Sequence, residues 1–459
     1  MNFYGRDEQL KVLSALIEKG DMQTVLIYGR RRVGKTALIK QLIDSTQVKS
    51  IYYECKETTE ENNIESISSV ISYAYNLPPL NFTSFEKTLE YLFEKSVSES
   101  LLLVIDEYPY LKKIVPGMDS ILQSLIDRYR DRGTIKLIIC GSYVEIMKNL
   151  VASDSPLYGR IDKTVDLKPM DYYESSLFYK GFSNEDKIRL YSVFGGIPYY
   201  NRLIDPKASV RENIINLIAS NGARLENEVS MYLKSEISKI NNANEVFETL
   251  AKGYSRFSDI LDKSHVSSSP TMVDVLDKLI SMSIVKKTTP INDEQNKKKA
   301  GYYISDSLSM FYYRYCFRYS SQLSVMNPDA FYDRYIAKDF EEWYVPHFFE
   351  EICKQYLVKQ NKQGKAPIPF HKIGKYWYNS PSTHSNGEFD IVTEGDDGFV
   401  FYEAKFMSKP LSRRTIEEEI EQVNKTGLKC NIYGFISRTG FEVDSIANCI
   451  LINLEELYK

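Results

Sequence analysis

The sequence predicts an α/β protein whose first third folds as a parallel β-sheet with helices on its faces. Short apolar runs typical of buried strands alternate there with amphipathic stretches of helical period. A glycine-rich loop lies between the first of these strands and the helix that follows it. Mixed α/β character returns from about residue 322, which indicates a second α/β domain toward the C-terminal end.

The expected elements of the first domain follow in a regular order. The strands are 24–28, 50–54, 101–106, 135–140 and 163–167, and the helices are 7–19, 35–44, 60–75, 83–98 and 118–131. From about 170 to 235 the pattern is helical, with an interruption at 195–200. Residues 241–305 then predict several short helices followed by a pair of strands.

Composition limits the class of protein. A chain of 459 residues corresponds to roughly three domains of about 150 residues each. Its hydrophobic fraction of 43% and charged fraction of 26% are ordinary for a globular protein. The formal net charge of -4 excludes a global positive field, so any contact with DNA has to come from local patches.

The cysteines and the lack of targeting signals predict a cytoplasmic protein. The six cysteines have no C-x-x-C pair and no Cys/His spacing suited to zinc, so we expect small buried thiols in a reducing compartment. The N-terminal stretch has a charged residue as early as Arg6 and lacks the apolar core of a signal peptide. No apolar run reaches the roughly 18 residues of a membrane span, so no membrane partner is expected.

The stretch LIYGRRRVGKTALIK matches the phosphate-binding pattern G-x-x-x-x-G-K-[ST] in its expected setting between a strand and a helix. Gly29 and Gly34 let backbone N–H groups close around phosphate oxygens at the positive end of the helix. Lys35 can reach the terminal phosphates of ATP, and the Thr36 hydroxyl can ligate Mg²⁺. The alternative is an accidental glycine turn. The residues expected to bind the nucleotide here are Gly29, Arg30, Arg31, Arg32, Val33, Gly34, Lys35, Thr36 and Ala37.

Two further strand ends supply polar groups beside this loop. The run LLLVID ends in Asp106, which can hold the metal through water, and Glu107 next to it is placed to polarise an attacking water. The run IKLIIC is followed by Ser142, which can hydrogen-bond the γ-phosphate or the lytic water. The alternatives are solvated acids at a strand end and a simple turn serine.

Four arginines are further candidates for phosphate contact. Arg30, Arg31 and Arg32 lie within the loop, and we expect them to be solvated, with one of them approaching a phosphate. Arg160 in LYGRIDK is a candidate in its own subunit or in a neighbouring subunit of a homo-oligomer. A surface arginine explains this residue as well.

These motifs resemble those of the archaeal-type P-loop ATPases, AAA-like proteins close to the signal-transducing (STAND) ATPases. FYGRDEQL, GRRRVGKTALI, LLLVIDEYPYL, CGSYVEIM, LYGR, LKPM and GGIPYY occur in the order found in that family, across residues 1–235. The resemblance implies that Tyr4 to Arg6 lie near the adenine. It also implies that the Gly195–Pro198 segment belongs to a helical lid over the nucleotide.

Residues 239–320 predict a winged-helix domain. A first helix, a short second helix at FSDILDK, a Ser-rich turn and a third helix from Ser269 precede a hairpin. In DNA-binding members the third helix enters the major groove and the hairpin touches the backbone. The third helix here carries Asp274 and Asp277 against only Lys278, so a spacer that reads no DNA is the alternative. The hairpin lysines available for phosphate contact are Lys286, Lys287 and Lys297 to Lys299.

An aromatic run, YYISDSLSMFYYRYCFRYS, follows the hairpin. Its rings could stack on bases of a nucleic acid. Their helical spacing favours packing between domains instead.

The C-terminal portion resembles the PD-(D/E)XK nuclease-like domain that is commonly fused to these ATPases. The helix HFFEEICKQYL precedes a Glu-x-Asp pattern in GEFDIV, a turn, and a Glu-x-Lys pattern in FVFYEAKF. The resemblance implies that Asp390 and Glu403 are Mg²⁺ ligands and that Lys405 positions or helps deprotonate the attacking water. It also implies that Glu350, on the helix, is an outer acid of this site and that Gln422 supports the site.

The residue types in this stretch suit phosphodiester chemistry. Asp390 and Glu403 are expected on the same side of a hairpin, and Glu403 and Lys405, two apart on a strand, share a face. Exposed charges at a sheet edge are the alternative. His384 lies close by and is interpreted as a loop residue.

Four parts are therefore expected along the chain. They are a P-loop α/β domain at 1–170, a helical lid at 171–238, a winged-helix domain at 239–320 and a restriction-endonuclease-like α/β domain at 321–459. The predicted function is hydrolysis of ATP with Mg²⁺, with the nucleotide state controlling a DNA-associated, Mg²⁺-dependent nuclease-like domain. The alternative is a nucleotide-switched signalling or binding protein whose C-terminal domain holds DNA or another partner without cutting.

Overall fold

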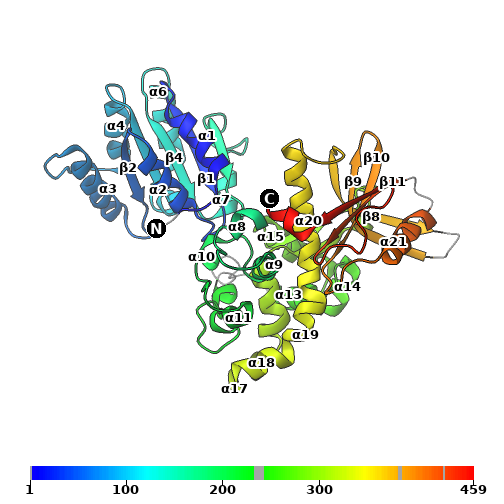
Figure 1. Ribbon diagram of the computed structural model, residues 1–459. Coiled ribbons are helices and arrows are strands. Elements are labelled where there is room, and N and C mark those ends of the chain that lie inside the picture. Colours follow the sequence, from blue (N-terminus) through cyan, green and yellow to red (C-terminus); the bar gives the residue numbers. More distant parts are fainter. Residues whose placement is uncertain (1–2, 232–241, 381–384, 427–429) are drawn as a thin grey trace. The chain divides into compact units, whose positions relative to one another are not determined.

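The computed structural model describes residues 3–231, 242–380, 385–426 and 430–459. The chain divides into two compact units, each built around a five-stranded sheet (Figure 1). Unit 1 comprises Met1–Met170 together with Ile197–Tyr199, and unit 2 comprises Asp171–Gly196 together with Tyr200–Lys459. The finer division into four domains stays a prediction.

Unit 1 contains a fully parallel sheet with the strand order β2-β3-β4-β1-β5. Its strands are β1 (Gln23–Tyr28), β2 (Lys49–Glu54), β3 (Leu101–Asp106), β4 (Lys136–Gly141) and β5 (Lys163–Asp166). Every residue of β1, β3 and β4 is buried, as expected of continuous apolar runs in a sheet covered on both faces. The five expected strands are confirmed, with ends that differ by one residue at most.

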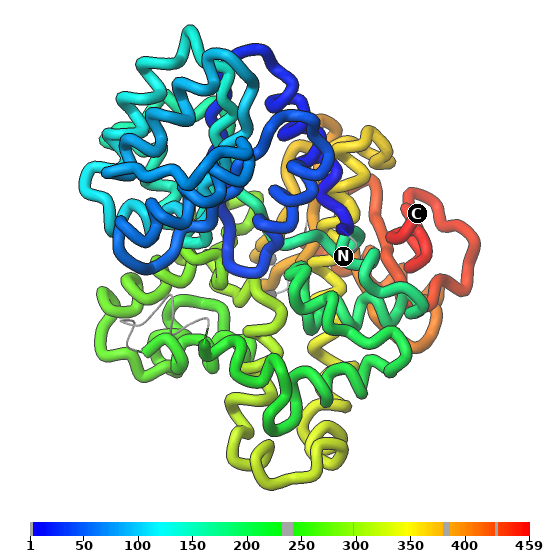
Figure 2. Tube along the Cα trace, turned by 90° about the vertical axis from the view of Figure 1, so that its left-hand side faces the viewer, coloured from blue at the N-terminus to red at the C-terminus, as the bar shows by residue number. Residues whose placement is uncertain are grey.

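Helices return the chain from one parallel strand to the next, as the blue-to-cyan trace in Figure 2 shows. They are α1 (Asp7–Ile17), α2 (Lys35–Ser45), α3 (Glu60–Tyr75), α4 (Phe85–Lys95), α5 (Tyr108–Ile114), α6 (Met118–Tyr129) and α7 (Val144–Asn149). The hydroxyls of Thr59 and Ser84 accept backbone N–H groups at the starts of α3 and α4 and so fix where these helices begin. Ile67, Leu92 and Leu122 pack with the sheet in one core. The five expected helices are confirmed.

Unit 2 opens with short helices and a hairpin. They are α8 (Tyr172–Ser176), α9 (Asn184–Phe194), α10 (Pro198–Asn201, which begins in unit 1), α11 (Val210–Leu217), α13 (Ala243–Ala251), α14 (Phe257–Lys263) and α15 (Ser269–Ser281), followed by the antiparallel strands β6 (Val285–Thr288) and β7 (Gly301–Ile304). A single turn, η1 (Lys297–Lys299), lies in the connection between these two strands. Three helices and a hairpin occur in the predicted order, and their assignment as a winged helix stays a prediction.

A mostly buried aromatic run follows this hairpin. It forms α16 (Ser307–Phe311) and the π-helical η2 (Tyr312–Phe317), and the chain continues through α17 (Ser320–Val325), α18 (Pro328–Tyr335), α19 (Ala337–Asp339), η3 (Phe340–Tyr344) and α20 (Val345–Lys362). Phe311, Tyr315 and Tyr344 are each at most 1% exposed and contact one another edge-on or tilted. Because these rings are covered by protein, they serve packing rather than base stacking.

The second sheet of unit 2 is mixed, with the order β12-β11-β10-β9-β8. Its elements are β8 (Lys372–Ser380), β9 (Ser385–Gly395), β10 (Gly398–Lys405), α21 (Arg413–Lys425), β11 (Cys430–Ser437), β12 (Cys449–Asn453) and the final turn η4 (Leu454–Tyr458). β8, β9 and β10 pair antiparallel, whereas β10, β11 and β12 pair parallel. The helix α21 joins β10 to β11, and Val392, Phe401 and Ile416 form part of the core below it.

The cysteines and the apolarity of the helices can be compared with the sequence expectations. All six cysteines are free thiols, five of them buried and Cys449 half-buried. Among the residues described, none of the helices combines the length and the apolarity that a membrane span needs.

Gly434 in β11 offers a direct test of the packing in the second sheet. A Cβ atom added there would lie 2.0 Å from the ring of Tyr402, which is 4% exposed and has no room to move. We expect Gly434→Ala to lower the free energy of unfolding of unit 2 by about 1–3 kcal/mol, measured by chemical denaturation. Gly20→Ala, which meets no atom within 4 Å, is the control and should change stability little. Equal stability of the two variants would contradict this packing.

Candidate functional site

The candidate nucleotide site of unit 1 begins with the loop between β1 and α2. Gly29 lies so close to a neighbouring segment that a Cβ atom there would be 2.3 Å from the carbonyl oxygen of Leu167. Gly34 has a φ of 99°, a left-handed conformation that glycine adopts without strain. The backbone path therefore requires both glycines of the motif, and it leads the loop to the N-terminal end of α2, where anions are favoured.

The Lys35 side chain folds back over this loop. Its ammonium group donates hydrogen bonds to the carbonyl oxygens of Gly29 at 2.8 Å and Arg30 at 3.2 Å. A third bond of 3.0 Å goes to the hydroxyl of Ser142, just after β4. The residue is 5% exposed, and burial lowers the pKa of its ammonium group although nearby Glu107 opposes this. Three neutral oxygens hold the cation, and a phosphate is a stronger acceptor than any of them.

The end of β3 brings a carboxylate to the first turn of α2. Thr36 donates from its hydroxyl to Asp106 Oδ2 at 3.0 Å. The Tyr52 hydroxyl in β2 donates to the same oxygen at 2.7 Å, and burial together with this bond raises the pKa of Tyr52 well above its ordinary value. Sequence reasoning missed Tyr52, because its only signal is its position in the strand next to β3.

Glu107 and Ser142 meet beside this carboxylate. Glu107 has a φ of 51°, a left-handed backbone conformation that is uncommon outside glycine. Its side chain accepts hydrogen bonds from the Ser142 hydroxyl and from the Ser142 backbone N–H, the latter at 3.2 Å. Since Ser142 also contacts Lys35, one serine joins the predicted general base to the predicted phosphate-binding lysine. The site residues on these strand ends are thus brought together.

The same groups fit a magnesium ion that accompanies a triphosphate. Mg²⁺ prefers oxygen ligands, and one or two protein groups suffice when phosphates and waters complete its shell. Thr36 and Asp106 provide a hydroxyl and a carboxylate oxygen 3.0 Å apart at the start of α2.

The loop arginines differ from the solvated set predicted. Arg30 is buried, with 8% of its surface exposed, so the expectation is wrong for this residue. Arg31 is half-buried and donates to the hydroxyls of Tyr110 at 3.3 Å and Tyr143 at 3.1 Å. Arg32 is exposed, and its guanidinium lies 4.3 Å from the centre of the Tyr199 ring. Tyrosines near the loop account for the positions of Arg31 and Arg32; they lie within the quoted motifs, but no role was predicted for them.

Arg160 does not lie beside the phosphate loop. It precedes β5 and donates two hydrogen bonds of 2.8 Å to the carboxylate of Asp127. Asp162, two residues later, accepts from the backbone N–H of Thr24 near the start of β1. Arg160 therefore lies at the amino edge of the parallel sheet, opposite the carboxyl edge that carries Lys35. Phosphate contact within its own subunit is contradicted, and contact with a neighbouring subunit stays a prediction.

Two segments implied by the resemblance border the loop within unit 1. Arg6 is 4% exposed and donates to the carbonyl oxygens of Val33 at 3.3 Å and Lys168 at 2.7 Å. Pro198 lies close to Gly34, with its Cγ 3.6 Å from the position of an added Cβ. Their roles at the adenine and in a lid stay predictions.

A second cluster of charged side chains lies on the β9–β10 hairpin of unit 2. Lys405 pairs with Glu403 at 2.7 Å on the same face of β10 and with Glu419 of α21 at 2.9 Å. Asp390 of β9 pairs with Lys375 of β8 at 2.7 Å. The structure thus brings together the predicted residues, and it adds Lys375 and Glu419, for which no motif provided a signal.

The helix α20 adds Glu350 to Asp390 and Glu403, and we call these three carboxylates the acid cluster. Burial and the charge of Asp390 raise the pKa of Glu350 from its ordinary 4.5 to about 8. Burial also raises the pKa of Glu403, against the effect of Lys405. Gln422 lies on α21 with its amide 3.5 Å from the Tyr378 hydroxyl, and His384 falls outside the described residues.

This second cluster does not fit a divalent cation as it is arranged. Within the described part of the chain, no three His, Cys, Asp or Glu side chains are grouped so that they could hold a metal ion. Lysine ammonium groups are instead the partners of Asp390 and Glu403. The residues expected to bind Mg²⁺ are present and close, but cations of the protein already pair with them.

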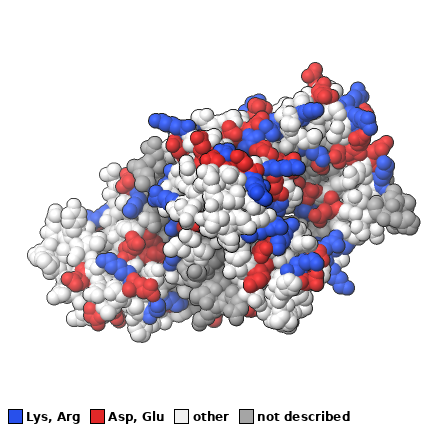
Figure 3. Space-filling view, turned by 90° about the horizontal axis from the view of Figure 1, so that it is seen from below, with Lys and Arg blue, Asp and Glu red and all other residues white. Residues whose placement is uncertain are grey.

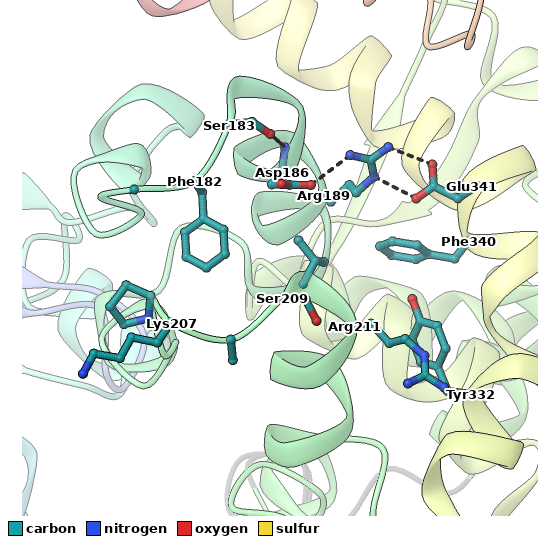
Figure 4. Close-up of a pocket in the computed structure, with 14 residues that line it drawn as sticks. Phe182, Ser183, Asp186, Arg189, Lys207, Ser209, Arg211, Tyr332, Phe340 and Glu341 are labelled. Carbon is teal, nitrogen blue, oxygen red and sulfur yellow. Dashed lines mark hydrogen bonds and ion pairs between the residues drawn. The ribbon is translucent and has the colours of Figure 1, made fainter.

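Unit 2 also contains a cavity of about 470 Å³ beside the N-terminal ends of α9 and α11 (Figure 4). Arg189 donates to Asp186 at 3.0 Å and to Glu341 at 2.8 Å across it. Arg211 pairs with Asp329 at 2.5 Å. Both of these arginines are thus neutralised by acids of the protein, and no motif indicated this cavity.

Family comparisons agree with the geometry of the first site. Residues 3–203 match a family described as an ATPase domain predominantly from Archaea. The chain contains an archaeal ATPase domain. Residues 312–420 match a second family, described as archaea bacterial proteins of unknown function.

The chain is similar to several archaeal proteins. An uncharacterized protein of Methanocaldococcus jannaschii is 27% identical over 470 residues, covering 99% of each chain. An uncharacterized ATP-binding protein of the same species is 22% identical over 273 residues, covering 48% of this chain and 73% of its own. The solved Walker-type ATPase of Pyrococcus abyssi has a TM-score of 0.50 and 20% identity, covering 68% of this chain and 96% of its own. This last likeness shows the fold.

Glu350 makes the stability of unit 2 dependent on pH. In the folded protein its carboxyl keeps a proton up to a pKa of about 8, whereas in the unfolded chain it loses that proton near 4.5. The folded state therefore binds more protons between these values, and stability falls as the pH rises through this window. We expect Glu350→Gln to remove a slope of up to about 1.4 kcal/mol per pH unit, measured by denaturation between pH 5 and pH 8. Identical slopes in the two proteins would contradict the assignment.

Proposed function

We propose that this protein binds ATP together with Mg²⁺ at the loop of unit 1 and hydrolyses it to ADP and phosphate. The observation that carries the proposal is the network around Lys35. Its ammonium group, the Thr36–Asp106 pair and the Glu107–Ser142 pair all lie at the carboxyl edge of one parallel sheet. Ligands of open α/β sheets bind at this edge.

Binding requires the side chain of Lys35 to exchange partners. Its present acceptors are two loop carbonyls and one hydroxyl, and charge-assisted bonds to phosphate oxygens are stronger than bonds to these neutral groups. The amides at the start of α2 favour the same anion. Thr36 and Asp106 would hold Mg²⁺, which neutralises negative charge on the phosphates when it is bound with ATP.

Hydrolysis is assigned to Glu107 as general base. Its carboxylate accepts two hydrogen bonds from Ser142, which orient it at the end of β3. From this position it can accept a proton from a water molecule that attacks the terminal phosphate. Ser142 contacts both Glu107 and Lys35, so its hydrogen bonds would change when Lys35 turns to a phosphate.

Two variants should separate binding from hydrolysis. Lys35→Ala removes the buried cation, and we expect the affinity for ATP to fall by about 100-fold, since hydrogen bonds to charged groups contribute roughly 1.5–3 kcal/mol each. Glu107→Gln keeps the shape but not the base, so ATP binding should persist while turnover falls by about 100-fold or more. Binding of a fluorescent ATP analogue and phosphate release measure the two effects.

Lys40→Ala is the matched control, because Lys40 is an exposed lysine of the same helix. It should bind and hydrolyse ATP as the wild type does. Turnover by Lys35→Ala at the wild-type rate would rule out the proposed function.

A second candidate function concerns the C-terminal part of unit 2. We propose that this part is nuclease-like and acts on DNA under control of the nucleotide state. The observation that favours it is the gathering of acids from α20, β9 and β10, one of which, Glu403, pairs with Lys405. On the face drawn in Figure 3, basic and acidic side chains are interspersed, so charge does not single out a DNA surface on that face. A domain that binds DNA or a protein without cutting is the alternative.

A plasmid-cleavage assay distinguishes these alternatives. If the cluster is catalytic, the purified protein with Mg²⁺ or Mn²⁺ should nick supercoiled DNA, with a rate that depends on ATP. Lys405→Ala should abolish nicking, whereas the exposed Lys409→Ala should not. Intact plasmid under every condition, in wild type and control alike, would leave the non-cleaving alternative or a cluster that stays closed to the metal ion.

A further inference from the structure

The connection between β6 and β7 is not a free loop. We define the strap as residues 290–299, which connect β6 to β7 and include η1. The sequence pattern assigns this stretch to the wing of a winged helix, which either touches DNA or belongs to a spacer that reads none. In the structure the strap instead packs against β8, the edge strand of the second sheet of unit 2.

Backbone pairing attaches the strap to β8. The N–H of Ile291 donates to the carbonyl oxygen of Lys375 at 2.8 Å. The Asn292 side chain then pairs with both backbone groups of Trp377, accepting at 3.1 Å and donating at 2.7 Å. Edge strands expose such groups and pair readily with any chain that reaches them. The strap therefore occupies the edge where another strand would otherwise add.

An apolar anchor fixes the position of the strap. Ile291 is 8% exposed and belongs to the same core as Tyr376 and Phe401. Gly374 in β8 makes room for it, because a Cβ atom there would lie 2.7 Å from Ile291 Cγ2. A glycine in the middle of an edge strand is explained by this close approach.

Two of the hairpin lysines, Lys286 and Lys299, contact other parts of unit 2. Lys286 pairs with Glu351 of α20 at 2.7 Å. The ammonium group of Lys299 lies 3.4 Å from the centre of the Trp377 ring. Glu294 of the strap pairs with Lys372 of β8 at 3.2 Å. Charges that a DNA-binding wing would offer to phosphates are used here within unit 2.

Lys375 links the strap to the acid cluster. Its carbonyl oxygen accepts the strap N–H, while its ammonium group pairs with Asp390 at 2.7 Å and with Glu388 at 2.7 Å. Burial lowers and the charge of Asp390 raises its pKa, with a net rise, so the group stays cationic. The strap thus holds the backbone of the residue whose side chain pairs with Asp390.

We propose that the strap is an autoinhibitory lock: by holding β8, it keeps the Lys375 ammonium on Asp390 and so closes the acid cluster to a divalent cation. The cluster opens only when the strap leaves β8 or when Lys375 turns away. The lock deepens the second candidate function but requires neither ATP hydrolysis nor DNA cleavage. It explains why Asp390, which is expected to bind Mg²⁺, is paired with Lys375 instead.

Binding of Mn²⁺ alone, followed by calorimetry and by the electron paramagnetic resonance signal of the free ion, tests the lock in the full-length protein. Lys375→Met should bind an additional Mn²⁺ ion at least tenfold more tightly than the wild type. Lys409→Met makes the same change of charge at an exposed position and should behave as the wild type. The gain should vanish in Lys375→Met/Asp390→Asn, which locates the ion at the cluster.

Two strap variants test the second half of the proposal. Asn292→Ala, a mild change, and Ile291→Ser/Asn292→Ala should each tighten Mn²⁺ binding while circular dichroism shows a folded protein. Wild-type affinity in Lys375→Met would overturn the lock. A gain in Lys375→Met without any gain in folded strap variants would overturn the role of the strap. Plasmid cleavage does not enter this test, so absence of nuclease activity leaves its outcome intact.

Discussion

A single buried cation, the ammonium group of Lys35, organises the first site. A charge taken out of water has to be matched by close acceptors, and here the acceptors come from the phosphate loop and from the end of β4. The three oxygens that hold Lys35 are uncharged, so none of its hydrogen-bond acceptors is an anion, although the carboxylates of Asp106 and Glu107 lie nearby. A nucleotide phosphate supplies the missing partner. The glycines, the parallel sheet and the polar strand ends are consistent with this one requirement.

In the acid cluster of unit 2, by contrast, charged side chains of opposite sign already neutralise one another. Its lysines already face carboxylates, Lys405 with Glu403 and Lys375 with Asp390. A site neutralised by its own side chains has little attraction for a further cation. The strap residues that fix β8 give this closed state a structural cause. In unit 1 a buried lysine has only neutral hydrogen-bond acceptors, whereas in unit 2 the carboxylates are already paired with lysines.

The sequence was sufficient for the parts of the fold governed by local rules. Periodicity located every strand of the first sheet, because buried parallel strands are nearly continuous apolar runs. The strand ends at Asp106 and Ser142 could be predicted to meet, since carboxyl ends of parallel strands share one edge. Tyr52 and Lys375 escaped prediction because their roles depend on which strands are neighbours. For Arg160 the motif leaves open contact with a phosphate in its own or in a neighbouring subunit, and its position before β5, at the opposite edge of the sheet, contradicts only the first.

Nucleotide binding at this site requires Lys35 to exchange its hydrogen-bond partners, and a crystal structure with a non-hydrolysable ATP analogue and Mg²⁺ shows whether it does. We expect the Lys35 ammonium to leave the carbonyl oxygen of Gly29 and to lie about 3 Å from an oxygen of the terminal phosphates. The Thr36 hydroxyl and Asp106 should then face the metal. A nucleotide bound elsewhere, or a Lys35 that still donates to Gly29 beside a bound triphosphate, would contradict the account.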